Sequence, residues 1–328
     1  MDSRPVSCKG LGEYYRLNGK LLEELYVSHL SDYTSWDQLD HAEDHIVFPD
    51  NIGTNISIDE TSLSQGELYT VVTNKAGKGR KGTLIAMIKG TDSETVKKVL
   101  RRKIPFQKRR MVKEVTLDMA ASMGQIVRGT FTAATLVTDR FHVQQLAYDA
   151  VQEMRIAYRW EALGRENTEM ELAKKVGRPF VPDRLENGDT HKQLLARSRY
   201  LLFKNKGKWT PSQIWRAELL FRYYPSLKQA YELAQSSGHI YHTVKDKGAG
   251  FTRLAKWYNE IEKAGFNSFN TVSRTVQQHY QTILNYFESR STNASAESFN
   301  AKIKAFRSQF RGVRNVAFFL YRLSKIYA

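Results

Sequence analysis

The stretch "NISIDETSLSQGELYTVVTNKAGKGRKGTLIAMIKG", residues 55–90, decides the fold of this chain. Three short runs within it are rich in Ile, Val, Thr and Tyr, which favour β-strands: residues 55–63, 68–75 and 82–90. The last two runs are joined by the Gly- and Lys-rich segment "AGKGRK", residues 76–81, which is typical of a hairpin turn. We therefore expect three antiparallel strands at the start of a sheet.

Helical and strand patterns alternate after these three strands. Thr91 or Ser93 can cap a helix over residues 91–104, whose late basic residues favour its negative end. A strand at 110–120, a helix at 121–132 and a fifth strand at 133–143 follow. The order β-β-β-α-β-α-β predicts an α/β fold, a mixed sheet flanked by helices, and it matches the RNase H-like fold.

The rest of the chain has mainly helical patterns. Residues 144–290 almost lack strand signals and contain long stretches with helical periodicity, which predicts a large all-α insertion. Leucines near the N-terminus also follow a helical spacing. The predicted organisation is an N-terminal helical cap (1–54), the first part of the RNase H-like core (55–143), an all-helical insertion domain (144–290) and the C-terminal helices of the core (291–328).

Composition points to a partner that carries negative charge. The chain has 328 residues, of which 41% are hydrophobic, and 50 Lys plus Arg against 34 Asp plus Glu, a formal net charge of +16. The excess is spread along the chain, and phosphate polymers are the partners that such a surface attracts. A basic solvated surface without a specific ligand, or attraction to anionic lipid, is the alternative.

Two classes of protein are disfavoured by the sequence. No apolar run approaches the roughly 18–20 residues that span a bilayer, and "MDSRPVSCKG" lacks the apolar stretch of a signal peptide, so we expect no membrane partner and a cytoplasmic protein beside the bacterial nucleoid. Cys8 is the single cysteine, which excludes an internal disulfide and a zinc site built from cysteines.

Three acidic residues stand in distinctive settings. Asp59 and Asp118 end strand-like runs, and Glu297 opens a helix, so the fold can gather their carboxylates at one edge of the sheet. Such a group binds a pair of divalent metal ions for phosphoryl chemistry. Glu60 would point to the opposite face of the sheet if its strand continues, and is therefore a weaker candidate ligand.

The helix that begins near Glu297 has two distinct faces. Asn293 or Ser295 can cap it, and the apolar residues at i, i+4, i+7 and i+11 define a buried face: Phe299, Ile303, Phe306 and Phe310. The other side carries Glu297, Asn300, Lys304, Arg307 and Arg311. A carboxylate followed by an amide and three cations suits a metal site beside a phosphate backbone, although an ordinary amphipathic helix would have a similar pattern.

Four strings carry a resemblance to a known family. They are "SIDETSLSQGELY" (57–69), "KEVTLDMAASM" (113–123), "LVTDRFHVQQLA" (136–147) and "STNASAESFNAKIK" (291–304), and they are similar to bacterial insertion-sequence transposases of the DDE type, specifically the ISL-three group and its ISAon branch. The resemblance runs from about residue 55 to the C-terminus. It implies an RNase H-like catalytic core with a helical insertion between the fifth strand and the helix that bears the last acid.

Two aspartates compete for the middle acid. In the RNase H-like fold the second acid lies at the end of the fourth strand, which selects Asp118 over Asp139. Asp139 and His142 then form an Asp-x-x-His pair, similar to a motif of many transposases with helical insertions. They are predicted to be auxiliary, as is Asn300, with Asp139 orienting a metal-binding carboxylate. His142 has the alternative of an ordinary hydrogen-bonded histidine near a strand end.

The predicted chemistry uses no nucleophile of the protein itself. Asp59, Asp118 and Glu297 would bind two Mg²⁺ ions, with Mn²⁺ as a substitute, because these ions prefer hard oxygen ligands. Water would first nick DNA at the end of the element. The resemblance implies that the new 3′-hydroxyl then attacks target DNA. The acids alone equally suit a nuclease without a joining step, and a transposase-derived DNA-binding protein that has lost catalysis is a further alternative.

Several cations are candidates for DNA contact. The hairpin turn contributes Lys75, Lys78, Arg80 and Lys81, the insertion contributes Lys204 and Lys206 from "LARSRYLLFKNKGKWT" (195–210), and the last helix contributes Lys304, Arg307 and Arg311. The basic run "KKVLRRKIPFQKRR" (97–110) is a further phosphate-binding candidate, for which a solvated helix face is the alternative.

The resemblance also implies partners. Double-stranded DNA is expected as terminal inverted repeats and as target, and a homodimer that bridges two DNA ends is the family expectation. Members of this group usually carry an N-terminal DNA-binding region, often with a zinc-binding cysteine cluster, which Cys8 alone cannot form. Three expectations follow. A companion polypeptide recognises the DNA ends, or the insertion domain does so, or the protein is an inactive truncated copy.

Overall fold

A computed structural model of the chain describes residues 1–63, 66–310, 313 and 315–328. The chain forms two compact units. The first comprises Met1–Asp139 and Ser289–Ala328 and contains the sheet, and the second, Arg140–Glu288, is built from helices. The sheet-bearing unit is therefore assembled from the two ends of the chain.

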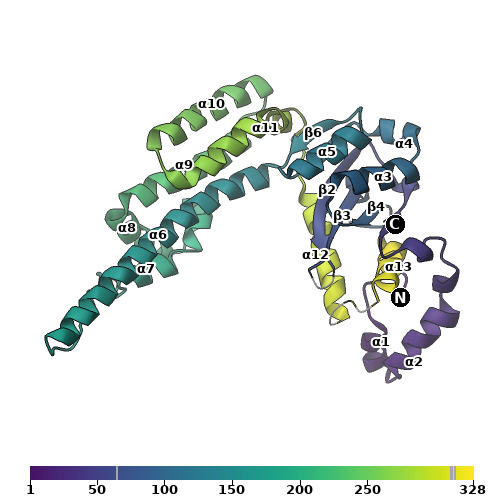
Figure 1. Ribbon diagram of the computed structural model, residues 1–328, viewed down its shortest axis with the longest axis horizontal. Helices are drawn as coiled ribbons and strands as arrows, with labels where there is room; N and C mark the ends of the chain where they lie inside the picture. The colour runs from purple at the N-terminus through teal and green to yellow at the C-terminus, as the bar shows by residue number, and fades with distance from the viewer. Residues whose placement is uncertain (64–65, 311–312, 314) are drawn as a thin grey trace. The chain divides into compact units, whose positions relative to one another are not determined.

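The first unit contains a six-stranded mixed sheet with the order β1-β4-β3-β2-β5-β6. Figure 1 labels β2, β3, β4 and β6 of this sheet. Its strands are β1 (His45–Val47), β2 (Asn55–Ser62), β3 (Leu68–Asn74), β4 (Leu84–Lys89), β5 (Glu114–Leu117) and β6 (Thr135–Thr138). The pairs β2–β3, β3–β4 and β1–β4 are antiparallel, whereas β5 pairs in parallel with both β2 and β6. This topology confirms the predicted RNase H-like fold.

One strand was not predicted. β1 lies inside the segment expected to be a helical cap, and it pairs along the outer edge of β4, with His45 opposite Ile88 and Val47 opposite Ala86. Its three residues are too few for a period-2 pattern to be visible in the sequence. It forms because β4 would otherwise present an edge of unpaired backbone N–H and C=O groups.

Helices cover both faces of the sheet. On one face lie α3 (Ser93–Lys103), α4 (Phe106–Met111) and α5 (Ala121–Thr130), and on the other lie α12 (Ala294–Gln309) and α13 (Val316–Tyr327). Along β2, Ile56 and Ile58 point into the first core with α3 and α5. The second core includes Phe299, Ile303 and Phe306 of α12, each fully buried, and partly buried Phe310, as the spacing predicted.

The N-terminal segment packs on α13. Its helices are α1 (Cys8–Tyr15) and α2 (Gly19–Leu25), and a small core joins Cys8, Tyr26 and Tyr33 to Phe318 and Tyr321. Arg322 of α13 is fully buried, and its guanidinium donates hydrogen bonds to the backbone oxygens of Met1 (2.7 Å) and Val6 (3.1 Å). These bonds anchor the first residues of the chain to its last helix.

The second unit is an assembly of long helices. They are α6 (Arg140–Lys175), α7 (His191–Arg197), α8 (Pro211–Tyr223), α9 (Pro225–Thr243), α10 (Lys247–Ala264) and α11 (Asn270–Ser289). Trp257 is a core residue, 2% exposed, and its indole donates to the Leu233 carbonyl at 2.8 Å. Trp160 and Trp215, by contrast, are exposed.

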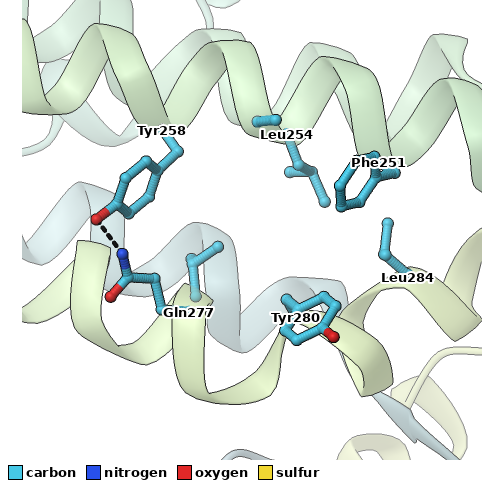
Figure 2. Close-up of a pocket in the computed structure, with 8 residues that line it drawn as sticks. Phe251, Leu254, Tyr258, Gln277, Tyr280 and Leu284 are labelled. Carbon is cyan, nitrogen blue, oxygen red and sulfur yellow. Dashed lines mark hydrogen bonds between the residues drawn. The ribbon is translucent and has the colours of Figure 1, made fainter.

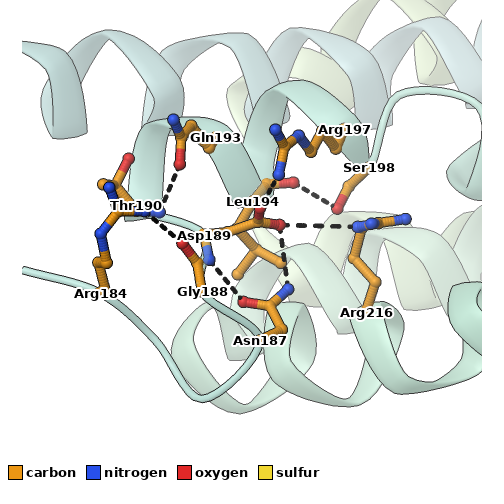
Figure 3. Close-up of polar contacts among 10 residues, drawn as sticks. All are labelled: Arg184, Asn187, Gly188, Asp189, Thr190, Gln193, Leu194, Arg197, Ser198 and Arg216. Atoms are coloured by element: carbon orange, nitrogen blue, oxygen red, sulfur yellow. Dashed lines mark hydrogen bonds and ion pairs between the residues drawn. The ribbon is translucent and has the colours of Figure 1, made fainter.

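A buried aspartate organises the segment between α6 and α7 (Figure 3). Asp189 is 1% exposed, accepts a hydrogen bond from Asn187 (3.0 Å) and forms ion pairs with Arg197 and Arg216. At the start of α7, the backbone N–H of Thr190 donates to the side-chain oxygen of Gln193 at 2.9 Å. This polar segment is therefore held by specific charge pairing within the second unit.

Among the residues that the structure describes, no helix is both long and apolar enough to cross a membrane.

We predict that Phe306→Ala lowers the free energy of unfolding by about 3–5 kcal/mol, because the ring is fully buried between α12, α13 and the sheet. Urea unfolding of the full chain measures the change. Gln309→Ala, an exposed position on the same helix, is the matched control and should change stability by less than about 0.5 kcal/mol. Equal effects of the two variants would contradict this packing.

Candidate active site

The register of the parallel strands brings three aspartates to one level of the sheet. Ser57 of β2 pairs with Thr116 of β5, and Thr116 pairs with Val137 of β6. Two residues beyond these positions are Asp59, Asp118 and Asp139, respectively. Since neighbouring strands lie about 4.7–4.9 Å apart, the three backbone positions span roughly 10 Å. The carboxyl-terminal ends of β5 and β6 thus place two acids beside Asp59.

A hydrogen bond fixes α12 against this level of the sheet. The side-chain Nδ2 of Asn300 donates to Oδ2 of Asp59 at 2.8 Å and to the Glu60 carbonyl at 3.2 Å. The same helix buries its aromatic face under β3 and β4, so Asn300 is brought to β2 by packing as well as by polar contact. Glu297 lies three residues earlier, on the same side of the helix.

Glu297 lies close to Asp139. A carboxylate oxygen of each can approach a common ligand position, the two oxygens being within 4.8 Å of one another. Asp139 is 1% exposed, whereas Glu297 is exposed. The backbone N–H of Asp139 donates to the Leu117 carbonyl at 3.0 Å, which holds it against β5. His142 follows three residues later in the first turn of α6, partly buried and edge-on to Phe141.

Asp118 lies near a different carboxylate. Its Oδ1 accepts a hydrogen bond from the Ala120 N–H at 2.9 Å, in the turn that leads into α5. Burial raises the pKa of Glu60, and the negative charges of Asp118 and Asp59 raise it further. The structure therefore gathers acids around Asp59 and Glu60 of β2, with Glu297 beside Asp139, and Asp118 in electrostatic reach of Glu60. Carboxylates repel one another, so a closer approach of several depends on the charge of a bound cation.

Buried polar atoms surround the start of α12. Asn293, at the N-cap position, is fully buried, and neither atom of its side-chain amide has a hydrogen-bond partner among the residues that the structure describes. The same holds, within those residues, for Oγ of Ser295 and Oδ1 of Asn300. Buried polar groups are normally satisfied, so this end of the helix suits water or a polar ligand beside the acids.

Lys75 has a different environment from the one predicted. Its ammonium lies inside the first unit, 3.4 Å from Glu114 and hydrogen-bonded to Thr116 and Ser291. Burial lowers the pKa of Lys75, and the Glu114 carboxylate opposes this effect. Lys75 therefore does not reach the surface as a phosphate contact, because the β5 face opposite it carries a buried carboxylate. In the sequence, the signal for this ion pair was Glu114, an acidic residue inside an otherwise apolar strand.

The other predicted DNA contacts lie mainly on the surface. Lys78, Arg80 and Lys81 are exposed in the turn between β3 and β4, beyond the end of the sheet opposite to Ser62. In α12, Lys304 is exposed, and Arg307 is half-buried with a hydrogen bond to the Ser62 carbonyl. In the second unit Lys204 and Lys206 are exposed. Arg311 lies outside the described residues.

A cavity in the second unit is lined mainly by apolar and aromatic side chains (Figure 2). It measures about 390 Å³, lies between α10 and α11, and has Phe251, Leu254, Tyr280 and Leu284 on its walls. Tyr258 and Gln277 close one end through a hydrogen bond. Its walls carry no ionisable group suited to phosphoryl chemistry, so the acidic edge of the sheet is the candidate active site.

The sheet order, with acids directly after two adjacent parallel strands, defines the RNase H-like class of fold. Within that class, the chain matches the transposase family of the DDE, ISL3 type over residues 56–323, and it belongs to that family. This confirms the resemblance seen in the sequence.

Two relatives match across most of the chain. They are the transposases for insertion sequence element IS1557 of Mycobacterium tuberculosis strains CDC 1551 / Oshkosh and ATCC 25618 / H37Rv, each 24% identical over 250 residues. The match covers 76% of this chain and 54% of each relative, so the chain spans about half the length of these relatives.

We predict that Lys75→Met lowers the free energy of unfolding by about 3–5 kcal/mol, because it leaves the Glu114 carboxylate buried without its cation. Urea unfolding measures the change. The double variant Lys75→Met with Glu114→Gln removes both charges and should recover most of the loss. A double variant no more stable than Lys75→Met would show that the ion pair is not the cause.

Proposed function

We propose that this chain carries the catalytic site of a DDE transposase that nicks DNA at the ends of an insertion sequence and joins the freed 3′ end to target DNA. The observation that supports this most directly is the hydrogen bond from Asn300 to Asp59, which holds α12 and its Glu297 at the level where Asp118 follows β5. Family membership supports the same reading.

The donor set fits magnesium. Asp59, Asp118 and Glu297 offer hard carboxylate oxygens, and the buried Oδ1 of Asn300 adds an unsatisfied acceptor beside them. These three acids would hold two Mg²⁺ ions, or Mn²⁺ in their place. When bound, such ions supply charge stabilisation to the phosphoryl group and favour the attacking and leaving oxygens as anions.

The residues around the acids have distinct tasks in this proposal. Asn300 holds the carboxylate of Asp59 in one orientation through its amide N–H. Asp139 is buried and close to Glu297, and it restricts the position of the longer Glu297 side chain. Asp118 is held by the Ala120 N–H at the end of β5. Each carboxylate is thus restrained by a neighbour, which reduces the reorganisation that substrate binding requires.

The reaction is a pair of phosphoryl transfers. In the first, a water oxygen bonds to the phosphorus at the element's end, the bond from phosphorus to the 3′ oxygen breaks, and the proton lost by water is balanced by one gained by that oxygen. In the second, the freed 3′-hydroxyl bonds to a target phosphorus and displaces the target's own 3′ oxygen. Both steps need only positioning and charge stabilisation from the protein.

The substrate in this proposal is double-stranded DNA, as terminal inverted repeats and as target. Exposed Lys78, Arg80, Lys81 and Lys304, and in the second unit Lys204 and Lys206, support backbone contact. A homodimer that holds two DNA ends, and recognition of those ends with the help of a companion polypeptide, belong to the same proposal. A nuclease without the joining step remains the second candidate, because the acids serve hydrolysis equally well.

We predict that Asp59→Asn, Asp118→Asn and Glu297→Gln each reduce nicking and strand transfer by about 10³-fold or more, because each removes a charge worth several kcal/mol to the transition state. The assay incubates labelled DNA that carries the element's ends with the full chain and Mg²⁺, and with any companion polypeptide that the wild type requires for cleavage. The nicked and joined products report the two steps. DNA binding by filter retention should persist in all three variants.

Asp139→Asn is the matched comparison for Asp118→Asn. Retained but reduced activity in Asp139→Asn supports its auxiliary position. An active Asp118→Asn beside an inactive Asp139→Asn would transfer the role of second acid to Asp139. Wild-type nicking without any joined product would favour the nuclease.

We also predict that Asn300→Ala raises the Mg²⁺ concentration needed for half-maximal nicking by about 10- to 100-fold, because Asp59 loses its orienting hydrogen bond. Binding of Mn²⁺, followed by its electron paramagnetic resonance signal, should weaken in parallel. Gln309→Ala, on the same helix and away from the acids, is the control. An unchanged metal requirement in Asn300→Ala would remove Asn300 from the site.

A further inference from the structure

A second polar groove lies in the first unit, between the edge strand β1 and α3. It measures about 400 Å³ and is lined by one face of α3, by His45 of β1 and by the end of β4. The α3 face presents Lys98 and Arg102, one helical turn apart, with Val99 between them. None of these residues belongs to the acidic edge.

The groove carries cations that are not paired. Lys98 and Arg102 are exposed, and among the residues that the structure describes neither they nor Lys103 form an ion pair with a carboxylate. Lys89, at the end of β4, does pair with Glu67 at 2.9 Å. Asp44 is the one acidic residue on the described wall. The groove therefore has a net positive charge.

A histidine pair positions the third cation. Lys103 Nζ lies 3.0 Å from Nε2 of His41, and Nδ1 of His41 lies 2.9 Å from the His45 carbonyl. Lysine can only donate, so Nε2 accepts and Nδ1 donates, which is the arrangement of a neutral imidazole. The rings of His41 and His45 stack 4.2 Å apart. Lys103 is thus held at the groove by an imidazole rather than by a carboxylate.

The shape and chemistry of the groove indicate the kind of ligand. Its volume exceeds what one small ion needs, and Ile88 and Val99 add apolar wall beside the cations. Arginine and lysine together suit phosphate oxygens, and an apolar wall suits the sugar between two phosphates.

The position of the groove along the strands follows from the strand register. Ile88 of β4 pairs with Thr70 of β3, and Thr70 pairs with Glu60 of β2. Along the strands the groove is therefore level with Asp59, two to three strand spacings or roughly 10–15 Å away in the plane of the sheet. It opens on the α3 face, whereas Asp59 turns toward Asn300 on the α12 face.

We propose that this groove binds the sugar-phosphate backbone of DNA through Lys98, Arg102 and Lys103. The inference rests on the proposed function, since it takes DNA as the ligand. It assigns a DNA-binding role to one face of the basic run at residues 97–110.

The test is the salt dependence of DNA binding by the full chain. Fluorescence anisotropy of a labelled duplex is measured over a series of KCl concentrations without divalent metal. Lys98→Gln with Arg102→Gln should make the slope of log K against log [KCl] shallower by roughly 1–2, because each lost phosphate contact removes about 0.9 from the slope. Lys97→Gln with Arg101→Gln is the matched control, with the same residue types and net charge on the same helix, turned away from the groove.

A second measurement does not depend on substitutions. Acetylation of lysines followed by mass spectrometry should show Lys98 and Lys103 protected by the duplex, with Lys9 of α1 as the reference. Protection by inorganic phosphate or a mononucleotide but not by the duplex overturns the DNA assignment.

Equal slopes for the groove variant and its control, in a wild-type protein that binds and nicks DNA, overturn the groove while the proposed function stands. A wild-type protein that binds no duplex, alone or with its companion polypeptide, overturns both.

Discussion

The hydrogen bond between Asn300 and Asp59 joins residues 241 positions apart in the chain, and the candidate active site depends on it. It fixes the height of α12 along β2, and with it the position of Glu297. The aromatic face of the same helix supplies the packing energy that this single bond cannot, since Phe299, Ile303 and Phe306 are fully buried against the sheet and α13. Apolar packing holds the helix on the sheet, and the polar contact sets its register.

A second long-range connection supports the first. Lys75, at the start of the β3–β4 turn, binds both the β5 face and Ser291, which lies three residues before the start of α12. The strand that carries Asp118 and the segment that leads to Glu297 are therefore tied to one buried ammonium. A buried charge is costly to bring out of water, and here the cost is offset by a carboxylate and two hydroxyl groups. Such a polar centre specifies one arrangement of three segments more sharply than apolar contact would.

The distribution of charge separates two tasks within the first unit. Acidic residues gather within β2 and directly after β5 and β6, although the chain as a whole carries a net charge of +16. Cations lie elsewhere on the unit, on the β3–β4 turn at the opposite end of the sheet, on α12 and in the groove beside α3. A polyanion is attracted to such a surface by its long-range field, while the acids meet it only where a cation neutralises them. In the proposed function, attraction of DNA and phosphoryl chemistry thus belong to different residues.

The local patterns of the sequence determined most of the elements. β-branched runs and a Gly-rich turn predicted β2, β3 and β4, and the i, i+4, i+7 spacing predicted which face of α12 is buried, because these features depend on near neighbours in the chain. The family motifs singled out Asp59, Asp118, Asp139 and Glu297. Only the tertiary structure decided what these acids lie beside. The pairing of β1 with β4, the burial of Lys75 against Glu114, and the approach of Glu297 to Asp139 all join residues distant in sequence. Such contacts follow from strand register and helix packing, in which a shift of one residue would turn each side chain to the other face of the sheet.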